Sequence, residues 1–194
     1  MRWGPPYRRV LVLGGARSGK SAFAERLAAT LGEPVLFVAT ATPDDAEMAE
    51  RIRLHRERRP GSWRTVEAPL RPAEAVPKEL GEARTILVED LTLLLSNVMS
   101  DPAHCEPADE QDVIDAFAAE QAVAAELESL LRLPAHVVLV SNEVGMGLVP
   151  LYPLGRAFRD ALGRINQLAA ARADDVFLLV AGVPLRVKPA QSVG

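Results

Sequence analysis

The chain has 194 residues, of which 48% are hydrophobic, and a formal net charge of −4 at pH 7. This length and apolar content suffice for a substantial core, so we expect a single domain over residues 1–194. We expect its core at about 8–188 and a short flexible tail at the C-terminus. The acidic balance provides no global basic field of the kind that attracts nucleic acid, so we expect no nucleic-acid partner.

The sequence also indicates the cellular compartment in which we expect the protein. Cys105 is the one cysteine of the chain and cannot form an internal disulfide. No segment reaches the roughly 18 to 20 uninterrupted apolar residues of a membrane helix, and residues 1–6 lack the apolar core of a signal peptide. We therefore expect a cytoplasmic protein with no membrane span.

Strand and helix signals alternate along the chain. In the first half they predict, in order, a buried strand at 9–13, a helix at 23–31, a strand at 35–40, a helix from 44 to about 59, a short strand at 63–67 and, after a Pro-rich connection, a strand at 85–88 with a helix to about 94. Asp44 with Glu47 three residues later resembles a capping box at the start of the second helix.

The second half continues the alternation. An exposed loop is predicted at 101–109, then a helix at 113–131, a strand at 136–141, a helix at 154–169, a strand at 176–180 and an edge strand or hairpin arm at 184–187. Strands alternating with helices of this length predict an α/β fold with a mainly parallel sheet and helices on both faces.

The most specific motif lies between the first predicted strand and helix and fits G-x-x-x-x-G-K-[ST]. Its residues are Gly14, Gly15, Ala16, Arg17, Ser18, Gly19, Lys20 and Ser21. Glycines let the backbone wrap around phosphate oxygens, successive N–H groups and the helix N-terminus direct partial positive charge inward, and Lys20 adds a full charge. Ser21 has the position of a ligand for phosphate-bound Mg²⁺. The motif and its flanks predict a fold of the P-loop NTPase type, with a glycine-rich turn that binds nothing as the alternative.

An acidic pair follows the strand at 85–88. Glu89 takes the position where P-loop proteins place an acid that holds Mg²⁺, directly or through water. An ordinary charged strand end is the alternative. Asp90 is a second candidate ligand, and because neighbouring residues of a strand point to opposite sides, periodicity does not decide between the two.

His55 lies on the helix predicted from residue 44, in register with Met48 and Ile52. A lone histidine on such a face is more often a core residue than a catalytic one. An arginine cluster follows it within four residues, and such a cluster beside an imidazole suits the charge of a triphosphate. Its members are Arg56, Arg58 and Arg59. A solvated basic face, supported by acid–base pairs at i,i+4 spacing, is the alternative.

Two further segments contribute polar groups. Residues 140–150 leave a buried strand with polar side chains followed by glycines, and ligands of open parallel sheets bind beyond the carboxyl ends of strands. Glu67 ends the strand at 63–67, and a carboxylate can accept from both N1–H and the exocyclic amine of guanine. By itself the segment at 140–150 also fits a plain turn, and Glu67 also fits an ordinary exposed acid.

Taken together, these segments resemble the bifunctional adenosylcobinamide kinase/adenosylcobinamide-phosphate guanylyltransferases of cobalamin biosynthesis. The resemblance runs from about Arg9 to Lys188. It rests on the segments 14–21, 38–41, 47–60, 63–67, 140–150, 158–160 and 163–167, in this order along the chain. The sequence departs from the family pattern at Asp90, where a small uncharged residue is expected, and at 151–153, where relatives often carry a more polar turn.

The resemblance implies two nucleotide chemistries. An NTP phosphorylates adenosylcobinamide. A histidine then attacks the α-phosphate of GTP, pyrophosphate leaves, and GMP passes to adenosylcobinamide phosphate to give adenosylcobinamide-GDP. His55, as the one histidine within the matching segments, is the implied nucleophile, and Lys20 the second implied catalytic residue. The resemblance implies GTP and ATP as nucleotide substrates, Mg²⁺ as the cofactor and the corrinoid as the acceptor. It also implies a homo-oligomer, namely a trimer.

The resemblance also assigns nucleotide contacts outside the P-loop. They are Ala39, Thr40, Ala41, Arg56, Glu57, Arg58, Arg59, Glu67 and Glu89. The implied Mg²⁺ ligands are Ser21 and Glu89.

Two other functions stay open on the residues alone. One is a P-loop kinase of another small molecule, in which His55 is structural. The other is a nucleotide-controlled switch or binding module, although no Asn-Lys-x-Asp guanine motif occurs in the chain. No residue is an evident base for the hydroxyl that a kinase would phosphorylate.

Overall fold

The computed structural model describes residues 7–43, 46–103 and 116–188. Within 46–58 it leaves out the side chains of Glu47, Met48, Arg51, His55 and Arg58. The capping box expected at Asp44, the segment around Cys105 and the C-terminal tail expected after Lys188 therefore lie outside the described residues.

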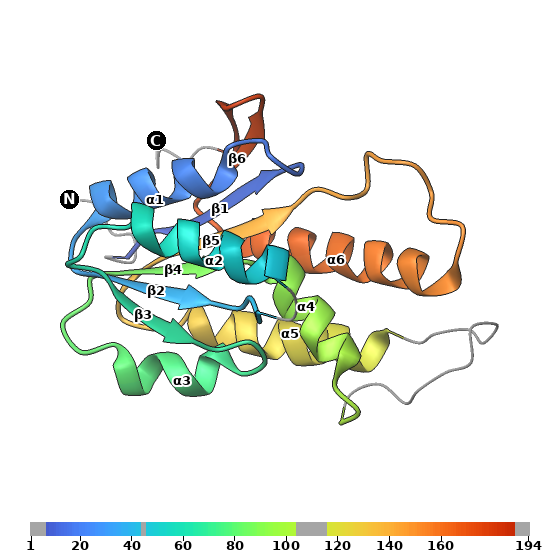
Figure 1. Cartoon of the computed structure of the whole chain (residues 1–194), viewed down its shortest axis with the longest axis horizontal. Helices are drawn as coiled ribbons and strands as arrows, with labels where there is room; N and C mark the ends of the chain where they lie inside the picture. The colour runs from blue at the N-terminus through green and yellow to red at the C-terminus, as the bar shows by residue number, and fades with distance from the viewer. Residues whose placement is uncertain (1–6, 44–45, 104–115, 189–194) are drawn as a thin grey trace.

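A seven-stranded sheet in the order β3-β2-β4-β5-β1-β6-β7 forms the centre of the molecule (Figure 1). Its strands are β1 (Arg9–Gly14), β2 (Val35–Ala39), β3 (Arg64–Glu67), β4 (Thr85–Glu89), β5 (His136–Asn142), β6 (Asp175–Val180) and β7 (Val183–Lys188). Neighbouring strands pair in parallel except β7, which runs antiparallel to β6 at one edge. The mainly parallel sheet and the hairpin arm are thus confirmed.

Helices cover both faces of this sheet. They are α1 (Lys20–Leu31), α2 (Ala46–Arg58), α3 (Pro72–Glu79), α4 (Leu91–Ser100), α5 (Phe117–Leu130) and α6 (Pro153–Arg172). Helix α1 packs on one face with Ala24 and Ala28, and α4, α5 and α6 pack on the other; in Figure 1, α1 and α2 are drawn in front of the sheet and α5 behind it. This arrangement confirms the predicted α/β class.

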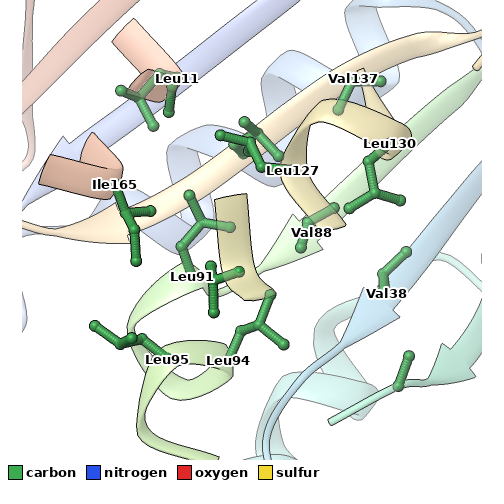
Figure 2. Close-up of a cluster of buried hydrophobic side chains, with 14 of the residues drawn as sticks. Leu11, Val38, Val88, Leu91, Leu94, Leu95, Leu127, Leu130, Val137 and Ile165 are labelled. Carbon is green, nitrogen blue, oxygen red and sulfur yellow. The ribbon is translucent and has the colours of Figure 1, made fainter. Parts of the chain in front are cut away.

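Two hydrophobic clusters, one on each face, explain why β1, β2, β4 and β5 contain continuous apolar runs. Val10 and Val12 pack with Ala24 and Ala28 of α1, while Leu11, between the two valines, belongs to the cluster on the opposite face. A strand covered on both sides needs apolar residues at every position, so the alternating pattern of a half-exposed strand disappears. Figure 2 shows the second cluster, in which Leu11, Val88, Leu91, Leu94, Leu127, Val137 and Ile165 meet.

The structure extends the predicted elements in two places. The connection after β3, predicted only as Pro-rich, contains α3, which has Pro72 in its first turn and buries Val76. The helix predicted to end near Leu94 runs to Ser100. It continues because apolar side chains at helical spacing stay buried along its length, as the next two turns place Val98 in the core. The long helix predicted from 113 begins at Phe117 within the described residues.

A buried carboxylate joins three segments at the amino ends of the central strands. Asp175 is 4% exposed. It accepts hydrogen bonds from Arg8 Nη2 and from Arg186 Nε, the latter at 2.9 Å. Arg8 directly precedes β1 and Arg186 belongs to β7, so the two ion pairs fasten both neighbours of β6 to its first residue.

We expect Asp175→Ala to lower the free energy of unfolding by about 1–3 kcal/mol, because two charge-assisted hydrogen bonds are lost and both guanidinium groups keep only part of their hydration. Glu74→Gln is the control, since Glu74 forms an exposed ion pair with Arg71 at 3.4 Å and such pairs contribute roughly 0–1 kcal/mol. Urea unfolding of both variants measures the difference. Equal destabilisation would show that Asp175 contributes no more than a surface charge.

Candidate active site

The carboxyl ends of the parallel strands meet at one edge of the sheet and carry the predicted site residues there. In the strand register, Gly14 at the end of β1 pairs with Asn142 of β5. Ala39 at the end of β2 pairs with Glu67 of β3 on one side and with Glu89 of β4 on the other. Residues more than a hundred positions apart in sequence are therefore neighbours at this edge.

The P-loop connects β1 to α1, and two of its glycines, Gly14 and Gly19, are required by its geometry. A Cβ on Gly14 would lie 2.4 Å from Ser18 Oγ, so a side chain at this position does not fit without movement. Gly19 has φ of +89°, in the left-handed region that favours glycine. The turn between β6 and β7 braces the loop, since Gly182 N donates to Ser18 O at 2.8 Å.

Two polar side chains of this loop are buried. Lys20, the first residue of α1, is 7% exposed, and its Nζ donates to Gly15 O at 3.4 Å. Ser18 is 8% exposed, and its Oγ has no hydrogen-bond partner within the described part of the protein. A buried hydroxyl without a partner is costly, and a phosphate oxygen held by the loop would supply one. The residues present therefore fit an anion.

A pocket of about 390 Å³ lies between α2 and the ends of β2, β3, β4 and β5. It is lined by Phe37, Ala39, Ala41, Pro43, Ala49, Ile52, Arg53, Arg56, Arg59, Glu67, Glu89, Asp90, Leu93 and Asn142. The strand ends and the loop after β2 contribute apolar surface and carboxylates, and α2 contributes arginines. A planar, partly polar group with a negatively charged tail matches this combination.

Two of the predicted arginines, Arg56 of α2 and Arg59 just after it, contact residues of β2 and β3. Arg56 donates to Glu67, and because both side chains are more than half exposed this ion pair contributes only roughly 0–1 kcal/mol. Arg59 lies over the ring of Phe37, 3.6 Å from its centroid, and donates to Thr65 Oγ1 at 3.0 Å. A ligand can therefore displace Arg56 from Glu67 at little cost.

Thr40, a predicted nucleotide contact, is fully buried and supports the pocket wall. Its N–H donates to Glu89 O at 3.1 Å, and its carbonyl accepts from Asn97 Nδ2 at 2.8 Å. Its hydroxyl donates to Asp90 O at 2.9 Å and accepts from Asp90 N at 2.7 Å. Each polar group of Thr40 therefore has a partner within the protein. Its neighbours Ala39 and Ala41 line the pocket.

Glu89 and Asp90 both line the pocket, but they differ in structural role. Asp90 Oδ1 accepts from Leu93 N at 2.8 Å and so caps the N-terminus of α4. Burial raises the pKa of Asp90 above its ordinary value, and the Glu89 carboxylate adds to this effect. The Leu93 N–H and the Lys20 ammonium act in the opposite direction. Lys20 is thus close enough to Asp90 to favour its charged form.

Other predicted site residues are not brought into this pocket or cannot be placed. Glu57 is exposed, and its carboxylate accepts from Arg53 Nη1 on the same helix. His55 belongs to α2, three residues after Ile52, which lines the pocket, but its side chain lies outside the described part of the structure, as does that of Arg58.

Pattern reasoning missed several contributors to the site. Phe37 reads only as one residue of a buried strand, and Leu93 as one residue of a buried helix. Asp90, Leu93 and Asn97, with spacings of three and four residues, share one face of α4 just after a strand end, and this spacing is a signal that could have been used. Asn142 lies in a segment predicted to border the site, and Thr92 Oγ1 accepts from its N–H at 2.9 Å.

No group of three or more His, Cys, Asp or Glu side chains that could hold a metal ion occurs within the ranges that the structure describes. Nor is any helix in those ranges long and apolar enough to cross a membrane.

The sheet order, the loop between β1 and α1 and the pocket beyond the strand ends define a P-loop nucleotide-binding fold. A solved structure of an ATPase from the type III secretion system of pathogenic bacteria is similar, with a TM-score of 0.53 over 89% of this chain and 51% of that one. At 10% identity it supports the fold alone. A family model described as cobinamide kinase / cobinamide phosphate guanyltransferase matches residues 10–187, and the chain belongs to this family.

Relatives agree with this assignment over nearly their whole length. The bifunctional adenosylcobalamin biosynthesis protein CobU of Escherichia coli (strain K12) is 44% identical, with 92% of this chain and 99% of the relative covered. The bifunctional adenosylcobalamin biosynthesis protein CobP of Pseudomonas aeruginosa is also 44% identical, with 93% of this chain and 97% of the relative covered.

Proposed function

We propose that this protein phosphorylates adenosylcobinamide with an NTP and then transfers GMP from GTP to adenosylcobinamide phosphate through a covalent His55–GMP intermediate. Family membership supports both activities. The observation that carries the proposal is the convergence at one sheet edge of a P-loop and a pocket lined by Arg56, Arg59, Glu67 and Glu89. One nucleotide can then place its phosphates in the loop and its base in the pocket.

The guanylyl transfer proceeds as two in-line displacements. In the first, a neutral imidazole nitrogen of His55 attacks the α-phosphorus of GTP, an N–P bond forms, and the bond to the pyrophosphate oxygen breaks. In the second, a phosphate oxygen of adenosylcobinamide phosphate attacks the same phosphorus and the N–P bond breaks. Lys20 and the arginines of α2 neutralise charge that develops on the leaving pyrophosphate.

Mg²⁺ fits the donor set at the proposed metal site. The Ser21 hydroxyl lies in the first turn of α1 and the Glu89 carboxylate at the end of β4, and both supply the hard oxygen ligands that Mg²⁺ prefers. We propose Glu89 in preference to Asp90 because Asp90 caps α4. When bound, the ion would supply positive charge to the transferring phosphate. Lys20 and the N–H groups of the P-loop hold and orient the same phosphates.

Glu67 is the proposed reader of the base. We expect Glu67→Gln to weaken guanylyl transfer from GTP about tenfold or more, because the carboxylate accepts from N1–H and N2–H₂ of guanine whereas an amide presents a mismatched donor. Phosphate binding should stay intact, and reactions with ATP, which lacks this donor edge, should change less. Steady-state kinetics with both nucleotides measure the effect. Equal losses with GTP and ATP, or no loss with GTP, would remove Glu67 from the base pocket.

One experiment separates the proposed function from its alternatives. The protein is incubated with α-labelled GTP, Mg²⁺ and adenosylcobinamide, and both protein and corrinoid are analysed. The proposed enzyme becomes labelled and yields adenosylcobinamide-GDP. A kinase of another small molecule leaves the protein unlabelled, and a switch binds or slowly hydrolyses GTP without transfer.

We further propose that residues 1–194 form one domain and that the protein is a cytoplasmic homo-oligomer, a trimer by family resemblance. Membership of all seven strands in one sheet supports the single domain. Exposed apolar side chains support self-association, among them Val183, Leu185 and Val187 on β7 and Leu148 and Leu151 in the loop before α6. Light scattering coupled to size-exclusion chromatography tests the mass.

A further inference from the structure

A side chain of α4 joins the segments that follow β2 and β3. Asn97 is half-buried, and its Nδ2 donates to Thr40 O at 2.8 Å and to Pro69 O at 3.0 Å. Thr40 directly follows the end of β2, and Pro69 lies two residues after Glu67, the last residue of β3. An amide nitrogen carries two N–H groups, and here each has a carbonyl acceptor.

The chemistry of the partners determines which end of the Asn97 amide faces them. Both partners are carbonyl oxygens, which can only accept, so the NH₂ group must point towards them. These carbonyls lie past the last residues of β2 and β3, where strand pairing no longer provides donors for them. Asn97 therefore supplies hydrogen bonds that the sheet does not, at the point where the chain leaves it to form the pocket walls.

Helix α4 is a rigid support for this amide. Leu91, Leu94 and Leu95 are fully buried in the cluster of Figure 2, and Asp90 caps the helix through Leu93 N. The helix is thus fixed at its start by the cap and along its side by core packing, so Asn97 has a defined position relative to β4.

The walls that Asn97 connects contain the residues proposed to surround the base. Ala39 and Ala41 flank Thr40 and line the pocket, and Glu67 precedes Pro69 and lines it from the other strand. A backbone bond from Ala68 N to Ala39 O, at 2.8 Å, already joins the strands themselves. Asn97 extends this connection beyond the sheet.

We propose that Asn97 is a positioning residue for base recognition, which fixes the segment after β2 relative to the segment after β3 without contacting the nucleotide. This inference rests on the proposed guanine pocket. Because the P-loop belongs to β1 and α1, which Asn97 does not contact through these bonds, phosphate binding is independent of it.

The test compares ligands with and without a base. For Asn97→Ala, which removes both donors, we expect the Kd of GDP to rise about tenfold in titration calorimetry. For Asn97→Asp, which places an acceptor against two acceptors, we expect a larger rise. Tripolyphosphate with Mg²⁺, which has no base, should bind both variants within about twofold of the wild type. Asn97→Ser keeps one donor and should lie between Ala and wild type, and it serves as the readout if the other variants do not fold.

Controls distinguish the inference from the function on which it rests. Ser96→Ala, at an exposed neighbouring position of α4, should bind both ligands as the wild type does. If Glu67→Gln weakens GDP but the Asn97 variants do not, Asn97 has no positioning role. If Asn97→Ala weakens tripolyphosphate as much as GDP, in step with a lower Tm, its role is general stability. If the wild type binds GDP no better than ADP and Glu67→Gln changes neither, the guanine pocket itself is wrong and the inference falls with it.

Discussion

Lys20→Ala is expected to abolish both phosphorylation and guanylyl transfer, with each rate falling about 10²-fold or more. In the proposed mechanism both reactions place a triphosphate in this loop, and the ammonium at the start of α1 neutralises charge that develops on the leaving group, which is the β-phosphate in phosphorylation and pyrophosphate in guanylyl transfer. The fold should persist, because Lys20 belongs to the phosphate-binding loop at the start of α1 rather than to either hydrophobic cluster.

The measurement uses purified protein and follows both products, adenosylcobinamide phosphate and adenosylcobinamide-GDP. Lys78→Ala is the matched control, since Lys78 is an exposed lysine in the last turn of α3. It should leave both rates unchanged. Near-normal turnover by a folded Lys20→Ala protein would show that this loop does not hold the reacting phosphates. It would also contradict the proposal that both reactions use the same phosphate-binding loop.

The P-loop could be predicted from sequence because its determinants are local. Gly14, Gly19 and Lys20 are required by the geometry of one turn and one helix start, and the motif records all three. The strands were predictable for a different reason. Burial on both faces leaves apolar residues at successive positions of the central strands, as in β4 and β5.

Elements fixed by distant partners could not be predicted in this way. Helix α3 has no side-chain cap of its own, and its Ala73 N donates instead to Glu126 Oε2 of α5 at 2.6 Å. A residue fifty-three positions away therefore satisfies its first turn, and the proline-rich sequence conceals it. Burial raises the pKa of Glu126, while the Ala73 N–H lowers it.

The site residues also differ in whether local sequence or distant partners determine their role. Glu67 and Glu89 were candidates as carboxylates at strand ends, the family resemblance assigned both to the nucleotide, and both line the pocket. Thr40 and Asn97 act through backbone partners on other segments, and such bonds depend on strand order rather than on residue spacing. The order β3-β2-β4 brings these three strand ends together, and that order becomes visible only in the folded chain.

His55→Ala or His55→Asn is expected to eliminate the acid-labile label that α-labelled GTP leaves on the protein, and transfer of GMP to the corrinoid phosphate with it. Phosphorylation of adenosylcobinamide should survive in large part, because γ-phosphoryl transfer needs the P-loop and no covalent imidazole step. In sequence His55 lies between Ile52 and Arg59, which both line the pocket, and its backbone belongs to α2.

The decisive comparison measures protein labelling, corrinoid phosphorylation and Tm on one preparation of each variant. His136→Asn is the matched control, because His136 is the first residue of β5 and so lies at the amino end of the strand, away from the pocket. Its Nδ1 accepts from Arg8 N at 2.9 Å. It should keep full labelling even if Tm falls. A structural role for His55 predicts instead a stability loss of about 1–3 kcal/mol and parallel damage to both activities. A stably folded His55→Ala protein that still takes up GMP would place the nucleophile elsewhere, and parallel loss of both activities without a change in Tm would make His55 part of the shared phosphate site.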